Sequence, residues 1–324
     1  MREPATATAR ASAATPATLR MLADVRHGLR APQKELPPTY FYDAYGSRLF
    51  DEITRLPEYY PTRAERALLV ARAKEIVELA DPRALAELGA GTADKSRILL
   101  RALTETHVAQ YLPIDVDGET LRATADSLRR EFPTLEVDPI VADMRDDVRA
   151  TGARHPLLYA FLGSTIGNFA PDDAAALLRR IRESLRPTDR LLLGVDLVKD
   201  VATLEAAYND ARGVTAEFNR NVLRVLNRDL GANFDLSAFA HRAFYDSTLR
   251  RIEMHLVARS AQCVHIPGVG IVSIDAGESI RTEISCKYDV ESVRALLAAS
   301  GFTLARWMTD ATRQFALALA EPMA

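Results

Sequence analysis

The segment Leu85–Ser96, with the sequence LAELGAGTADKS, constrains the fold of this chain more than any other stretch. Its first residues are mostly apolar, Gly89 and Gly91 follow, and Thr92–Ser96 begin a helical pattern. Glycine lets the backbone turn sharply and lets a ligand lie against bare peptide. The segment therefore predicts a strand, a glycine turn and a helix. Asp94 replaces the third glycine of the dinucleotide-binding pattern, and an ordinary α/β crossover explains the turn about equally well.

Strand and helix patterns alternate along the first two thirds of the chain. The expected strands are 85–88, 111–116, 136–142, 157–162 and 190–196, and the expected helices are 63–80, 95–104, 118–132 and 171–185. Segment 157–162 (LLYAFL) is apolar throughout, as central strands of parallel sheets are. This alternation predicts an α/β fold with a doubly wound parallel sheet and right-handed crossovers.

After residue 198 the alternation stops. Residues 199–239 are expected to be mainly helical, 250–260 and 270–288 to be antiparallel strands, 289–300 to be a helix, and 302–309 and 314–320 to be strands. We expect one domain from 60–198 and 287–324, and a second, α+β domain from 20–59 and 199–286. The Ala/Thr-rich residues 1–19 are expected to form a disordered tail.

Composition narrows the class of protein. A net charge of −3 and a pI near 6.1 give no basic field for nucleic acid. The apolar runs are too short to span a bilayer, so no membrane association is expected. Cys263 and Cys286 form neither a metal spacing nor a disulfide framework, and the histidines show no ligand spacing. We therefore expect a cytoplasmic protein without a metal.

Acidic residues stand near the ends of three successive expected strands. With Glu87 before it, the glycine turn resembles the E-x-G-x-G turn of S-adenosylmethionine-dependent methyltransferases. Asp115 could accept both ribose hydroxyl protons, and Asp143 could meet an adenine amino group. A lone strand-end aspartate is usually a helix cap or turn residue, but three favour a cofactor site. Lys95 could face the methionine carboxylate or be a solvated helix residue.

Several unusual strings then converge on one family. They are YFYDAYGSRLF (40–50), DEITRLPEYYPTR (51–63), LGSTIGNF (162–169), GVTAEFNRNVL (213–223) and RTEISCKY (281–288). Together with ELGAGTADKS they closely resemble the histidine-specific N-alpha-methyltransferases of ergothioneine biosynthesis, over residues 36–322. The resemblance implies a class I methyltransferase Rossmann-like sheet with a second, substrate-binding domain. Relatives in the wider family methylate other amines, such as an indole-derived amino acid in fungi.

The resemblance also implies roles for individual residues. The positions that match contacts with S-adenosylmethionine are Gly89, Lys95, Asp115, Asp143 and Met144, the last standing where a Phe is common. The positions that match the substrate pocket are Tyr42, Tyr59, Asn168, Tyr208, Met254, Glu283 and Ser285. Within this pocket the family uses Tyr59, Asn168 and Tyr208 for the α-amino and carboxylate groups. Asn168 and Tyr42 are the candidates for catalytic roles.

Glu283 and Ser285 would read the imidazole in this comparison, and their spacing is compatible with that role. Two positions apart in a strand, they face the same way, and a carboxylate plus a hydroxyl suits a ring with one N–H and one acceptor nitrogen. A solvent-facing side of an antiparallel sheet is the alternative. Asn168 could accept from the substrate amine through its amide oxygen, or serve only as a turn residue after Gly167.

The expected activity is trimethylation of the α-amino group of L-histidine to hercynine, the first step of ergothioneine biosynthesis. The expected partner is this small molecule alone, with S-adenosylmethionine as co-substrate, and the chain is expected to be a monomer. Two alternatives stay open: N-methylation of another amino acid or amine, and a non-catalytic protein that binds S-adenosylmethionine.

Overall fold

The computed structural model describes residues 15–105 and 109–323. Backbone contacts divide the chain into two compact units, which we describe separately. The larger unit comprises Leu49–Thr215, Ala243–Met254 and Ile284–Ala324, and the smaller unit comprises Met1–Arg48, Ala216–Arg242 and His255–Glu283.

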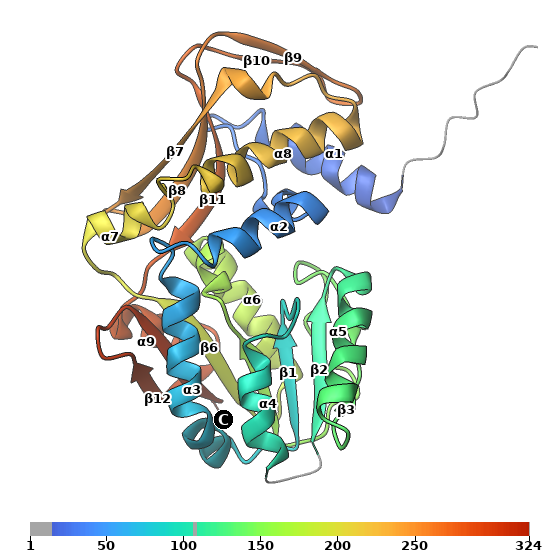
Figure 1. Ribbon diagram of the computed structural model, residues 1–324, viewed down its shortest axis with the longest axis vertical. Coiled ribbons are helices and arrows are strands. Elements are labelled where there is room, and N and C mark those ends of the chain that lie inside the picture. Colours follow the sequence, from blue (N-terminus) through green and yellow to red (C-terminus); the bar gives the residue numbers. More distant parts are fainter. Residues whose placement is uncertain (1–14, 106–108, 324) are drawn as a thin grey trace, which may run out of the picture. The chain divides into compact units, whose positions relative to one another are not determined.

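A mostly parallel sheet forms the centre of the larger unit. Its strand order is β12-β13-β6-β5-β1-β2-β3, with β4 also paired to β2. The strands are β1 (Ala84–Leu88), β2 (Gln110–Asp115), β3 (Glu136–Val137), β4 (Ile140–Val141), β5 (Leu157–Phe161), β6 (Arg190–Asp196), β12 (Phe302–Thr309) and β13 (Phe315–Pro322). The arrowheads of β1 and β2 point the same way in Figure 1, whereas β13 runs antiparallel to β6 and β12. The predicted α/β class with a mostly parallel sheet is confirmed.

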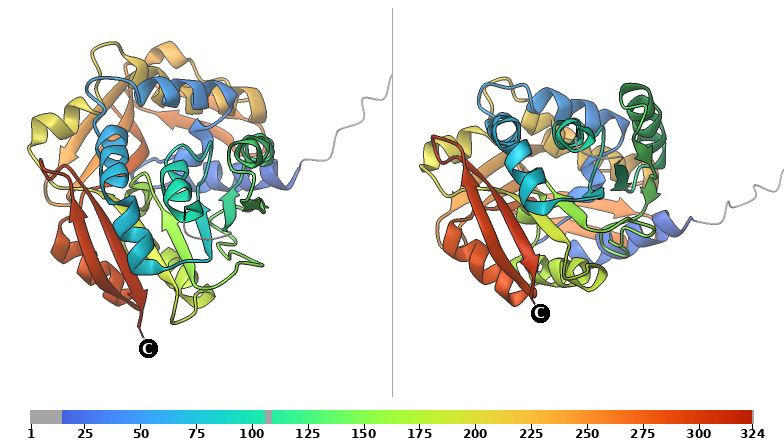
Figure 2. Two further views of the ribbon diagram at one scale, coloured as in Figure 1. Left: turned by 60° about the horizontal axis from the view of Figure 1, so that its bottom comes forward. Right: turned by 90° about the horizontal axis from the view of Figure 1, so that it is seen from below.

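Helices cover both faces of this sheet. The helices of the larger unit are α3 (Pro61–Ala80), α4 (Ser96–Thr104), α5 (Gly118–Glu131), α6 (Pro171–Ser184), α7 (Val201–Ala206) and α9 (Val290–Ala299). Figure 2 shows α3, α4 and α5 on one side of the sheet and α6 and α9 on the other. Alternate strand residues feed separate cores: Leu85 and Tyr111 pack with α3–α5, whereas Ala86 and Leu112 pack with α6 and α9.

The third predicted strand, 136–142, is not continuous. It forms β3 and β4, which pair with opposite ends of β2: Glu136 lies opposite Gln110, and Ile140 opposite Ile114. Pro139 stands between them, and proline cannot donate a hydrogen bond to the sheet ladder. The pairing resumes one residue later.

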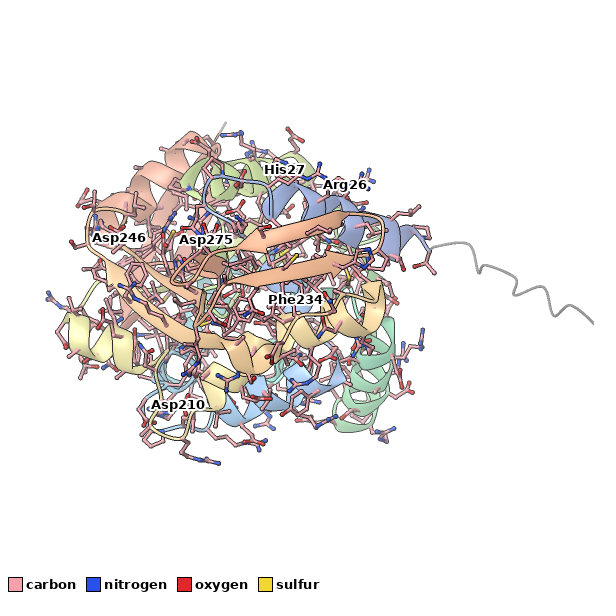
Figure 3. All side chains as sticks on the ribbon, turned by 90° about the horizontal axis from the view of Figure 1, so that it is seen from above. Arg26, His27, Asp210, Phe234, Asp246 and Asp275 are labelled. Carbon is pink, nitrogen blue, oxygen red and sulfur yellow. The ribbon has the colours of Figure 1, made fainter. Side chains whose placement is uncertain are left out.

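The smaller unit contains α1 (Pro16–Gly28), the 3₁₀ turn η1 (Pro38–Phe41) and a hairpin of β9 (Gln262–Ile266) and β10 (Gly270–Ile274). The side chain of Arg26, labelled in Figure 3, projects from α1 and donates to the carbonyl of Gly268 in the hairpin turn. The hairpin alternates buried Val264, Ile266, Val272 and Ile274 with exposed or half-exposed positions. The sequence analysis did not identify β9, because polar residues interrupt its short apolar pattern.

Five further elements contain boundaries between the units: two helices, α2 (Ala44–Ile53) and α8 (Val214–Leu230), and three strands. The strands are β7 (Phe239–Asp246), β8 (Arg251–Ala258) and β11 (Ser279–Cys286), which form one sheet in the order β11-β8-β7. The predicted helical segment 199–239 contains α7, α8 (Val214–Leu230) and the turn η3 (Leu236–Ala238), with irregular chain between them. The strand β7 starts at Phe239, the last residue of this predicted helical segment, and was not predicted.

The division by contacts differs from the boundaries that the sequence predicts. Residues 49–59, 199–215, 243–254 and 284–286 belong to the larger unit, although the sequence analysis groups them with the second domain. Local patterns do not reveal with which core a segment packs. In the predicted tail, residues 1–14 lie outside the described residues, and 16–19 form the first turn of α1. A Thr15 side-chain cap and Pro16 at the first turn favour this start.

Candidate functional site

The glycine turn follows β1 directly, as the sequence predicts. Gly89 and Gly91 have φ angles of 72° and 48°, in the left-handed region that glycine adopts without steric cost. The Ile114 carbonyl accepts the Gly89 N–H at 2.8 Å, which fixes the turn to the end of β2. Apart from Gly91 and its two chain neighbours, no atom of the described residues lies within 4 Å of the place where a Cβ on Gly91 would stand. This side of Gly91 is therefore open to a ligand.

Asp115 lies at the end of β2 and contacts this turn. One of its carboxylate oxygens accepts the Gly91 N–H at 3.0 Å, and the other accepts the Asp117 N–H at 3.1 Å. A carboxylate has about four lone-pair sites, so each oxygen retains capacity for another donor. The structure thus places a half-buried, oriented acceptor beside the glycine turn, which is the chemistry that a ribose diol requires.

Asp143 and Met144 follow β4. The Met144 methyl carbon lies 3.8 Å from the place of a Cβ on Gly89, so the structure brings Met144 to the glycine turn. The Asp143 carboxylate is held by Arg145, with the closest side-chain contact at 2.8 Å and the Arg145 backbone N–H at 2.9 Å. This pair orients Asp143, and its role toward adenine stays a prediction.

Lys95 is part of a polar cluster that includes a residue missed in the sequence analysis. Its ammonium lies 2.5 Å from the carboxylate of Glu65 on α3, and Glu65 also accepts the Gly163 N–H at 2.7 Å. Glu65 is fully buried. A glutamate on the apolar face of the 63–80 helix was the available signal. Glu65 positions Lys95 at the end of β1, and the contact of Lys95 with a methionine carboxylate stays a prediction.

Glu87 of β1 lies nearby, buried, and accepts the Tyr111 hydroxyl at 2.5 Å. Burial raises the pKa of this carboxyl to about 7, although the Tyr111 hydrogen bond and the Lys95 charge act in the opposite direction. Near neutral pH this side chain therefore exists in both protonation states.

A second group of predicted residues meets at the last residues of β11. A Cβ on Gly167 would lie 2.8 Å from the carbonyl oxygen of Cys286, so only glycine lets the turn η2 (Thr165–Asn168) approach this strand so closely. Asn168 then donates its amide N–H to the Ile284 carbonyl at 2.8 Å. This bond fixes the orientation of the amide, and the role of its oxygen toward a substrate amine stays a prediction.

Tyr59, Tyr208 and Ser285 belong to the same group. The Tyr208 hydroxyl donates to Ser285 Oγ at 2.9 Å, and the rings of Tyr59 and Tyr208 pack edge to face at 6.3 Å. Met254 of β8 is buried in the larger unit. Glu283 and Tyr42 are assigned to the smaller unit. Glu283 is half-buried, and Tyr42 is 50% exposed, with its ring edge to face with Phe218.

The sequence analysis missed a buried ionic cluster in the larger unit. Asp196, at the end of β6, contacts the ammonium groups of Lys199 at 2.6 Å and Lys287 at 2.8 Å, and accepts the Tyr60 hydroxyl at 2.8 Å. Lys287 also donates to Ser285 Oγ at 2.8 Å. The signal was weak, because Lys287 lies in RTEISCKY without any sign that its side chain is buried.

The two lysines respond differently to burial. Burial favours the neutral form of both ammonium groups. It lowers the pKa of Lys199 to about 8 despite the Asp196 carboxylate. For Lys287, attraction to Asp196 outweighs burial and raises the pKa above its ordinary value. For the Asp196 carboxyl, burial acts in the opposite direction and would raise the pKa, but the two ammonium groups hold this pKa below its usual range. Lys287 and Asp196 are therefore a charged pair at neutral pH.

Within residues 15–105 and 109–323, no group of three or more His, Cys, Asp or Glu side chains is arranged to hold a metal ion. In the same part of the chain, no helix is long and apolar enough to cross a membrane.

Comparisons with known proteins show the family of this chain. The model of a family described as histidine-specific, S-adenosylmethionine-dependent methyltransferases matches residues 21–322. The chain belongs to this family. Histidine N-alpha-methyltransferase of Mycolicibacterium smegmatis is 48% identical over 299 residues, which cover 92% of this chain and 93% of that protein. Ergothioneine biosynthesis protein 1 of Neurospora crassa is 30% identical over 288 residues, covering 83% of this chain and 31% of that protein.

A solved structure supports the fold of this methyltransferase. An S-adenosylmethionine-dependent methyltransferase from Clostridium acetobutylicum superposes with a TM-score of 0.50 at 10% identity, covering 87% of this chain and 100% of that one. At this identity the likeness concerns the fold alone.

Proposed function

We propose that this methyltransferase transfers three methyl groups from S-adenosylmethionine to the α-amino nitrogen of L-histidine. The product is trimethylhistidine (hercynine), so the reaction is the first step of ergothioneine biosynthesis. Membership of the histidine-specific family supports the reaction class. The observation that carries the proposal is the Asn168 amide, anchored on the Ile284 carbonyl beside Ser285.

The residues at the glycine turn fit S-adenosylmethionine. Gly91 leaves its peptide open, and Asp115 keeps acceptor capacity on both carboxylate oxygens. We assign the ribose hydroxyls to Asp115, the adenine to Asp143 and Met144, and the methionine carboxylate to Lys95. The co-substrate supplies a methyl group already activated on a sulfonium.

Asn168 would orient the attacking nitrogen. An amine must be uncharged to attack, and histidine's α-amino group is largely protonated at neutral pH. The Asn168 oxygen can accept a hydrogen bond from either form, whereas one of its two amide N–H groups donates to Ile284. Alignment of nitrogen, methyl and sulfur and exclusion of water should supply most of the acceleration. Water would carry the proton away, and Tyr42 is the candidate for assisting this transfer through its hydroxyl.

The pocket must also tolerate a permanent cation after the third transfer. A trimethylated nitrogen has no N–H left to donate, so Asn168 can no longer bind it by a hydrogen bond. Tyr59 and Tyr208, packed edge to face, present aromatic faces that attract quaternary ammonium groups. Their pairing supports repeated methylation of one bound amine.

Specificity for histidine would come from Glu283 and Ser285, which are two residues apart on β11. Glu283 would accept a hydrogen bond from the ring N–H, and Ser285 would form a hydrogen bond with the other ring nitrogen. A site built from polar groups rejects ligands that leave those groups unpaired.

Mass spectrometry tests the proposal directly. The protein is incubated with S-adenosylmethionine and each amino acid in turn, and the products are examined for gains of one, two and three methyl groups. Trimethylation of histidine alone supports the proposal. A different amino acid or amine as the preferred acceptor would establish the first alternative, and binding of S-adenosylmethionine without transfer to any of them would favour the non-catalytic one. The cytoplasmic location and monomeric state stay predictions from the sequence.

A further inference from the structure

The hydroxyl of Ser285 receives two hydrogen bonds inside the larger unit. Tyr208 donates to Ser285 Oγ at 2.9 Å, and Lys287 donates to the same oxygen at 2.8 Å. A serine oxygen has two lone pairs and one proton. With both lone pairs engaged, the O–H proton is the only hydrogen-bonding capacity that Ser285 can offer to a substrate.

The two donors cannot easily reverse their roles. The Lys287 ammonium has three hydrogens and no acceptor capacity, and three acceptors surround it: Asp196 at 2.8 Å, Ser285 at 2.8 Å and Tyr208 at 3.1 Å. The Tyr208 oxygen accepts from Lys287, and the Tyr208 hydroxyl donates its own proton to Ser285. The Lys287 hydrogens and the Tyr208 proton therefore each have an acceptor within the network, and the Ser285 proton is left for a substrate.

We propose that Lys287, held by Asp196, is a positioning residue that makes Ser285 a hydrogen-bond donor and thereby selects the substrate ring by its acceptor nitrogen. The proposal rests on the proposed function, in which Ser285 reads the imidazole. It adds that Ser285 recognises an unprotonated ring nitrogen and rejects a ring that presents N–H or C–H at that position.

The surroundings of Lys287 keep this arrangement charged. Its side chain is fully shielded from solvent, and it lies over the Tyr208 ring at 5.0 Å as well as beside Asp196. Attraction to Asp196 raises the pKa of Lys287, so it stays protonated over the range in which the enzyme operates. Lys199 shares the Asp196 carboxylate but directs its other bonds to Tyr60 and the Leu197 carbonyl. Lys199 is therefore a matched control.

The test compares L-histidine with pyrrolylalanine, an analogue that keeps a ring N–H and replaces the acceptor nitrogen by C–H. The measured quantity is kcat/KM for each substrate in the wild type, Lys287→Met, Ser285→Ala and the double variant. Wild-type enzyme should prefer histidine. In each single variant, the ratio of kcat/KM for histidine to that for pyrrolylalanine should fall about tenfold, which is the scale of one hydrogen bond to a polar group. In the double variant, this ratio should fall no further than in either single variant.

Lys199→Met removes one ammonium from the same carboxylate and should change the preference less than twofold. Circular dichroism and thermal unfolding establish that each variant is folded. Should Lys287→Met not fold, Tyr208→Phe removes the other donor to Ser285 while leaving the Lys287–Asp196 pair, and it should reduce the preference similarly.

The outcomes separate this inference from the proposed function. If wild-type enzyme does not methylate histidine, the proposed function fails. If it does, but Lys287→Met lowers kcat/KM equally for both substrates, or to the same extent with and without Ser285, then Lys287 is only structural and the inference is overturned.

Discussion

Replacing Glu87 by glutamine should change how the stability of the protein depends on pH. Glu87 is buried on β1, where it accepts the Tyr111 hydroxyl at 2.5 Å. Glutamine has nearly the same shape, and its amide oxygen can accept the same hydrogen bond. The substitution therefore removes the titration while it retains the packing.

The magnitude follows from the pKa of Glu87, which burial raises from 4.5 to about 7. This interval corresponds to about 3 kcal/mol, since a tenfold change in proton affinity is worth about 1.4 kcal/mol. The folded state binds the proton more tightly than the unfolded state. The contribution of Glu87 is therefore fully present below pH 4.5 and is lost as the pH rises to about 7.

The assay is chemical denaturation of wild type and Glu87→Gln at several pH values from 4.5 to 8.5. Subtracting the two curves cancels the other titrating groups. The variant should gain about 3 kcal/mol relative to wild type across this range. The exposed Glu78 on α3 provides a matched control, because its side chain stays in water on folding. A difference between wild type and Glu87→Gln that does not change with pH would refute the reasoning.

Three further predictions concern the site. Asp115→Ala removes the ribose acceptor and should weaken the binding of S-adenosylmethionine by about 1–3 kcal/mol in calorimetry. An affinity equal to that of the wild type would show that Asp115 is not part of the site. Asn168→Ala should lower kcat more than it disturbs binding of the co-substrate, because Asn168 orients the nitrogen; an unchanged kcat would leave it a turn residue. Glu283→Ala should weaken histidine and reduce the ratio of kcat/KM for histidine to that for tryptophan. An unchanged ratio would show that Glu283 does not read the ring.

The arrangement of the sheet was predictable because its signals are local. An apolar run predicts a buried strand, and a following glycine pair predicts the turn, so β1, β2, β5 and β6 and the glycine turn lie where the sequence placed them. The break between β3 and β4 was not recognised, although Pro139 is visible in the sequence. Hydropathy alone made 136–142 look continuous.

The sequence by itself determined the parallel sheet, the glycine turn with Asp115 at the next strand end, and the family. The sheet and the turn depend on residue type and on periods of a few residues, whereas the family follows from the resemblance of several strings to known methyltransferases. Only the tertiary structure decided the partners of buried charges. Glu65 meets Lys95, and Asp196 meets Lys287. Such pairs join residues far apart in the sequence. The sequence shows which side chains carry a charge, but it does not show whether water solvates that charge or an opposite charge neutralises it. Burial of the side chain decides between solvation and ion pairing, and burial is a property of the folded chain.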